Sequence, residues 1–137
     1  MLIAGLVFAA IAALIHVYIF VLESVMWTAP RTRATFGIES EADARLTRPL
    51  AFNQGFYNLF LAIAVFLGIG FVWAGVVAVG ATLVFVGATL VFVGTGSMVA
   101  AGLVLLLSSP ARARPALVQL VPPLIAIVLV AVGLLNA

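Results

Sequence analysis

Two ionisable side chains lie inside a long apolar stretch of the sequence, IHVYIFVLESVMW, at positions 15–27. His16 is the only histidine of the chain, and Glu23 is the only acid outside the polar segment 31–48. An imidazole can take up or release a proton near neutral pH, and a carboxylate can bind a cation or accept a proton. The chemistry open to this pair is therefore the binding of a charged or polar ligand, or acid–base catalysis.

Neutral polar side chains in the later apolar segments could complete such a site. Amide and hydroxyl groups both donate and accept hydrogen bonds, so they can orient a polar ligand. The predicted ligand-binding residues are His16, Glu23, Asn53, Gln54, Tyr57, Asn58 and Gln119. The predicted secondary residues are Tyr18, Trp27, Arg48, Ser97 and Pro122.

Helical geometry predicts that these side chains gather at two depths along the apolar segments. Glu23 lies about four residues inward from the end of its segment at Trp27, which is roughly 6 Å along a helix. The amides predicted at the same depth are those of Asn53, Gln54 and Gln119. His16 lies about eleven residues inward. The polar groups predicted near that depth are those of Asn58 and Ser97.

An ionisable side chain that faced lipid would cost about 2.5 to 3.5 kcal/mol on insertion scales. We therefore expect His16 and Glu23 to face the interior of a helical bundle, where they line a hydrated pocket. Two purely structural interpretations remain open. Glu23 could form an ion pair with Arg48 or another arginine of the connector, and His16 could hydrogen-bond Ser97 or Asn58 on another helix.

The composition places the chain among the polytopic membrane proteins, because 66% of its residues are hydrophobic and 7% are charged. The absence of cysteine excludes disulfides and thiolate metal sites. One histidine and one acid are too few for a closed metal site, and we expect no cofactor. Six scattered arginines are too few for nucleic-acid binding.

Apolar runs long enough to cross a bilayer are predicted at about 2–27, 50–72, 77–107 and 116–135. The uncharged run from Leu50 to Leu107 is too long for one crossing, so a turn is predicted between Gly68 and Gly80. The sequence therefore predicts a single all-α domain over residues 1–137, an integral membrane four-helix bundle.

The connector at 28–49 carries four arginines and is predicted to contain a short surface helix. Ser40 followed by Asp43 is typical of a helix cap, and Pro49 fits the start of the next helix. A second connector carries Arg112 and Arg114. Two crossings separate the connectors, so both lie on one side of the membrane. The positive-inside rule makes that side cytoplasmic and places both termini of this multi-pass protein outside.

A perfect tandem repeat, GATLVFV, occupies 80–86 and 87–93. Seven residues are nearly two helical turns, so Gly80, Gly87 and Gly94 are predicted to lie on one face of the third span. One interpretation is a duplication that lengthened the helix without changing its face. The other is a seam for a homo-oligomer or a larger membrane complex.

The sequence resembles a family of small bacterial four-span membrane proteins, domain of unknown function 1304. The resemblance is carried by HVYIFVLESVMWTAPRTRATFG, AFNQGFYNLFLA and LVQLVPPL, which include most of the predicted site residues. The chain departs from the family in the repeat region and at Val104, where the family tends to have a tyrosine. The resemblance implies a four-span fold and no biochemical function.

Three functions are open. The first is binding or moving a small polar molecule or lipid headgroup in a cytoplasm-facing polar pocket, with Glu23 as the anchor and His16 as a deeper, proton-sensitive partner. The second is a small membrane enzyme that acts on a lipid or amphiphile. The third is an accessory subunit of a larger membrane complex. Membrane lipids are expected partners in all three.

Overall fold

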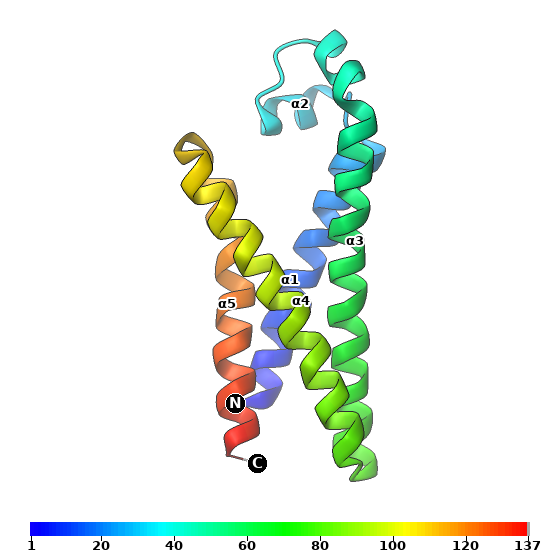
Figure 1. Ribbon diagram of the computed structural model, residues 1–137, viewed down its shortest axis with the longest axis vertical. Coiled ribbons are helices and arrows are strands. Elements are labelled where there is room, and N and C mark those ends of the chain that lie inside the picture. Colours follow the sequence, from blue (N-terminus) through cyan, green and yellow to red (C-terminus); the bar gives the residue numbers. More distant parts are fainter. Residues whose placement is uncertain (137) are drawn as a thin grey trace. The chain divides into compact units, whose positions relative to one another are not determined.

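The computed structural model describes residues 1–136, and the regular elements in this range are all helical (Figure 1). They are α1 (Leu2–Phe20), the π-helical turn η1 (Val21–Val25), α2 (Pro30–Phe36), α3 (Glu41–Ala78), α4 (Ala81–Ser108), the 3-10 turn η2 (Pro110–Arg112) and α5 (Ala113–Leu135). The predicted all-α class is confirmed.

Four helical segments are long and apolar enough to cross a membrane. They are Leu2–Val25, Glu41–Ala78, Ala81–Ser108 and Pro110–Leu135. A helix satisfies its own backbone hydrogen bonds, which makes it one of the two structures that can span hydrocarbon. The segments agree with the number of predicted spans, and the chain is a multi-pass membrane protein.

The chain divides into two compact units. One contains Met1–Ile15 and the chain from Leu61 onward, and the other is His16–Phe60. The helices α1 and α3 each contribute one part to each unit. The unit His16–Phe60 contains the end of the first span, α2 and the first half of α3.

A single helix, α3, extends from Glu41 through Pro49 to Ala78, where the sequence analysis expects a separate surface helix and a new start at Pro49. The predicted cap is present, because the Asp43 N–H donates to Ser40 Oγ at 3.0 Å. Pro49 offers no N–H to the carbonyl of Arg45. Both residues are exposed, so water can hydrate that carbonyl and the helix continues.

The length of α3 exceeds what one crossing needs. Its 38 residues extend about 57 Å, whereas the hydrocarbon core is about 30 Å thick. The charged turns before Pro49 therefore extend the helix beyond the apolar layer. The other end of α3 agrees with the prediction, since the turn at Val79 and Gly80 lies in the expected interval.

The glycines of the tandem repeat pack against α3. A Cβ atom on Gly87 would lie 2.5 Å from the backbone nitrogen of Val72 and 2.6 Å from the carbonyl oxygen of Gly68. A Cβ atom on Gly94 would lie 2.5 Å from Val65 Cγ2. The face that suggested an oligomer seam is thus covered within the chain, while the oligomeric state itself stays a prediction.

Close glycine contacts also join other helices of the unit that contains Met1–Ile15 and the chain from Leu61 onward. A Cβ atom on Gly5 of α1 would lie 2.7 Å from the backbone nitrogen of Val130 on α5. A Cβ atom on Gly102 of α4 would lie 2.8 Å from Leu120 Cβ on α5. Small residues let membrane helices approach until their backbones touch, which increases van der Waals contact. Such contacts hold together the unit that contains α4 and α5.

Replacing Gly87 with alanine tests the contact between α3 and α4. We expect Gly87→Ala to lower the free energy of unfolding by about 1 to 3 kcal/mol, because the new methyl group meets main-chain atoms that cannot rotate away. Gly96→Ala on the same helix is the control, since a Cβ atom there meets nothing within 4 Å. Thermal unfolding in detergent micelles, followed by circular dichroism, measures both. Equal stability of the two variants would contradict the close contact.

Candidate functional site

The two ionisable residues of the first span are buried in the protein. The exposed fraction is 1% for His16 and 8% for Glu23. The inward orientation predicted for both is therefore confirmed. Two threonines, Thr32 and Thr95, are the other buried polar residues in the described range, and Thr95 donates to the Val91 carbonyl of its own helix at 2.6 Å.

The carboxylate of Glu23 accepts a hydrogen bond from Asn58. The distance from Asn58 Nδ2 to Glu23 Oε2 is 2.9 Å. The same amide nitrogen donates to the carbonyl oxygen of Gln54, one turn earlier in α3, at 3.2 Å. Both hydrogens of the Asn58 amide are thus used, and the bond to its own helix holds the amide in the orientation that presents it to Glu23.

Two further contacts show that the first span and α3 are antiparallel in this unit. Trp27 Nε1 donates to Thr47 Oγ1 at 3.1 Å. Nearer the middle of the span, the rings of Phe20 and Phe56 meet edge to face with centroids 5.2 Å apart. From the first contact to the second, the residue number falls from 27 to 20 along the first span and rises from 47 to 56 along α3, so the two helices run in opposite directions. Glu23 lies between these two contacts.

Gly55 allows the two helices to approach closely beside the carboxylate. A Cβ atom on Gly55 would overlap Ser24 Oγ and would lie 3.2 Å from Glu23 Cβ. Ser24 Oγ donates across the same contact to the carbonyl oxygen of Phe52 at 2.9 Å. A larger residue at position 55 would push Ser24 away and remove Glu23 from the reach of Asn58.

Glu23 lies on a π-helical turn, Val21–Val25, in which the Met26 N–H donates to the carbonyl oxygen of Val21 at 2.9 Å. Such a turn inserts one residue into the helical repeat and rotates the side chains that follow it. Short π-helical turns occur frequently at functional sites. A period of 3.6 residues per turn does not predict this turn, and no proline or glycine marks the position in the sequence.

The partner of Glu23 differs from the prediction. The sequence predicts Asn58 near the deeper level of His16, whereas in the structure its amide donates to Glu23. Side chains on a helix lean toward the N-terminus of that helix. In an antiparallel pair, Glu23 and Asn58 therefore lean toward each other, which closes a gap of about one turn that the count of backbone positions leaves open.

Glu23 does not form an ion pair with Arg48. Arg48 is exposed, and the salt bridge found within residues 1–136 joins Arg45 and Glu41. The long α3 explains this result, because its charged turns lie beyond the level of Glu23. The carboxylate of Glu23 is held by a neutral amide and not by a cation.

The other polar groups predicted on the second span do not face inward. Asn53, Gln54 and Tyr57 are exposed, and the Asn53 Nδ2 to Tyr57 hydroxyl distance is 3.5 Å, at the limit of a hydrogen bond. At 100° per residue the four polar side chains from Asn53 to Asn58 cover an arc of about 140°. One helix contact cannot cover so broad an arc, and Asn58 is the member that reaches the first span.

The remaining candidates are placed as follows. Tyr18 is exposed, and Trp27 is half-buried against Phe36, with ring centroids 5.0 Å apart. Ser97 is exposed and donates to the carbonyl oxygen of Val93 in its own helix at 2.8 Å. Gln119 and Pro122 are half-buried. Ser97, Gln119 and Pro122 belong to the other compact unit, so their place in a site with Glu23 stays a prediction.

Residues that the sequence analysis did not select also shape this region. Ser24, Thr47 and Gly55 make the contacts that set the spacing between the first span and α3. Thr32 of α2 is fully buried, and its hydroxyl has no hydrogen-bond partner in the described part of the chain. Only Gly55 carried a sequence signal, as a small residue inside an apolar span. No three acidic or histidine side chains come together within residues 1–136.

A double-mutant cycle tests the bond between Glu23 and Asn58. We expect Asn58→Leu to cost about 1.5 to 3 kcal/mol of stability, because it leaves a buried carboxylate without its donor. In the Glu23→Leu background the same change is expected to cost less, with a coupling energy of about 1 to 2 kcal/mol. Unfolding in detergent micelles measures each variant. A cycle of Glu23→Leu with Asn53→Leu is the control and should show no coupling.

The comparison with known proteins agrees with the four apolar helices. The family model described as "Protein of unknown function (DUF1304)" matches residues 10–131. The matched range includes every predicted site residue, all of the unit His16–Phe60 and most of the other unit. No curated protein and no solved structure matches the chain. The chain therefore belongs to the DUF1304 family, whose members are proteins of unknown function.

Proposed function

We propose that this membrane protein binds a small polar molecule or lipid headgroup that carries a positive charge, with the carboxylate of Glu23 as the anchor. The proposal is supported by the burial of that carboxylate and by the neutral group that it bonds to. Glu23 is buried, lies in an apolar span and accepts its described hydrogen bond from the neutral amide of Asn58. Intramembrane ionisable residues usually have a functional partner.

The carboxylate has capacity for a further partner. Its two oxygens offer about four acceptor positions, and the Asn58 amide supplies one donor to Oε2. Burial of a charge without a counter-charge costs several kcal/mol. A ligand with an ammonium group, or with several hydroxyl groups, would supply the missing donors and offset this cost. An anion would add repulsion.

His16 is the deeper member of the proposed site. It lies seven positions before Glu23, which is about 10 Å along a helix. We infer that His16 responds to protons that accompany the ligand, because a neutral imidazole gains a positive charge on protonation. The exposed amides of Asn53 and Gln54 are proposed to orient the ligand on its way to Glu23.

The separation of His16 and Glu23 favours binding over catalysis. About 10 Å is too far for one group to pass a proton directly to the other. The enzyme alternative therefore requires a substrate that extends over both groups. The accessory-subunit alternative relied on the glycine face of α4, and α3 covers Gly87 and Gly94 on that face.

Ammonium compounds test the proposed anchor. We expect ethanolamine at ten times its dissociation constant to stabilise the protein by about 1.4 kcal/mol, which raises the midpoint of thermal unfolding by a few degrees. Acetate at the same ionic strength should have no effect. Glu23→Gln should abolish the shift, whereas Glu39→Gln, which changes an exposed acid of the same unit, should preserve it. An equal shift in Glu23→Gln would contradict the proposal.

The proposed site opens to the cytoplasm, because we place both arginine-bearing connectors on that side of a bacterial inner membrane. The chain has no cysteine, so single cysteines can report orientation. Ala42→Cys and Ala111→Cys are expected to react with a membrane-impermeant maleimide in inverted vesicles only. Val79→Cys, at the exposed turn after α3, should react in intact cells. The opposite pattern would reverse the topology.

A further inference from the structure

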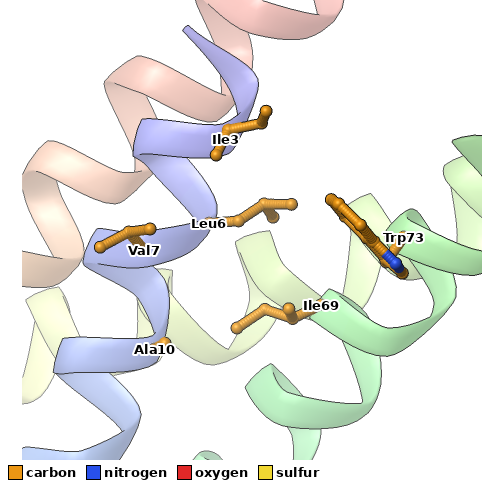
Figure 2. Close-up of a pocket in the computed structure, with 6 residues that line it drawn as sticks. All are labelled: Ile3, Leu6, Val7, Ala10, Ile69 and Trp73. Atoms are coloured by element: carbon orange, nitrogen blue, oxygen red, sulfur yellow. The ribbon is translucent and has the colours of Figure 1, made fainter.

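An apolar groove lies between the first turns of α1 and the last turns of α3. It has a volume of about 250 Å³ and is lined by Ile3, Leu6, Val7, Ala10, Ile69 and Trp73. Figure 2 shows Ile3 and Leu6 directed toward Trp73, and Ile69 directed toward α1. All six residues belong to one compact unit, and this unit does not contain Glu23.

The shape of the groove follows from the sizes of its residues. Leu6 is buried and forms the floor, and the small side chain of Ala10 leaves the groove open beyond it. The rims are exposed, with 68% of Ile3 and 58% of Trp73 accessible. The groove therefore opens away from the protein, toward the surroundings of two membrane-spanning helices.

The surroundings and the lining restrict what can occupy the groove. Each lining residue lies in a segment that crosses the membrane, and apart from the indole nitrogen of Trp73 no lining side chain carries a polar atom. From Ile3 to Ala10 the groove extends about 10 Å, which is less than the half-thickness of a 30 Å hydrocarbon core. A groove of this length lies within one leaflet. Its volume is below the usual range for a site that encloses a whole small molecule.

Trp73 indicates which end of the groove is nearest to water. The residue lies five positions before the end of α3, and tryptophan is enriched where a span meets the headgroup level. Its side chain is 58% exposed, so the indole N–H can reach an acceptor outside the protein. The N–H of an interfacial tryptophan usually finds an acceptor, and ester and phosphate oxygens are the acceptors present at that level.

We propose that this groove holds one acyl chain of a membrane phospholipid, with the headgroup at the level of Trp73. The chain lies along Leu6 and Ala10, and the indole ring forms its side wall. Dispersion contacts with a surface that follows the chain hold this lipid longer than the lipids around flat helix faces. The site is independent of the proposed ligand at Glu23.

A photoactivatable lipid tests the proposal. The probe is a phosphatidylcholine with a diazirine on one acyl chain, added at an equimolar ratio to the full chain in detergent micelles. Mass spectrometry should find the label mainly on residues 3–10 and 69–73. We expect Ala10→Phe, which fills the groove, to reduce the labelling about tenfold. Trp73→Ala, which removes a wall, is expected to reduce it about fivefold.

The matched control is Ala101→Phe, the same change at an exposed position of α4, which should leave the labelling unchanged. Label spread evenly over the four spans would overturn the proposal, and so would full labelling of Ala10→Phe. A dimer that Ala10→Phe dissociates, with no label in the groove, would also overturn it, because a second copy of the chain would then be the occupant. Thermal unfolding of each variant shows that it is folded.

Discussion

Hydrocarbon cannot donate or accept a hydrogen bond, and this property of the solvent governs the positions of the polar groups in the protein. The backbone meets the constraint by forming helices, and the side chains of the first span meet it through α3. Glu23 accepts from Asn58, and Ser24 donates to the carbonyl oxygen of Phe52. Each of these bonds gives a polar group the partner that water would provide in aqueous solution.

Close approach of the helices is the condition for these bonds. Gly55 lies at a close contact between the first span and α3, next to Ser24 and Glu23. In the other unit, Gly87 and Gly5 bring α4 to α3 and α1 to α5. Without a hydrophobic force between helices in lipid, such contacts depend on van der Waals packing, and glycine permits the most of it. The same residue type therefore serves polar contacts in one unit and apolar contacts in the other.

The two units offer different chemistry. In His16–Phe60 the buried carboxylate and imidazole belong to the first span, and a π-helical turn carries the carboxylate. The other unit contains the apolar groove beside Trp73. A polar anchor suits a charged group, and an apolar groove suits a hydrocarbon chain. The two surfaces belong to different units, so each can be tested without the other.

The amino-acid sequence by itself determined the all-α class, the number of spans and the burial of His16 and Glu23, because hydropathy and the cost of a charge in lipid depend on composition and order alone. Only the tertiary structure decided that Asn58 is the partner of Glu23, that Asn53 and Gln54 are exposed, and that α3 covers the repeat glycines. These outcomes depend on the rotation of one helix against another and on the lean of each side chain. A π-helical turn changes that rotation locally, and no periodic pattern in the sequence records it.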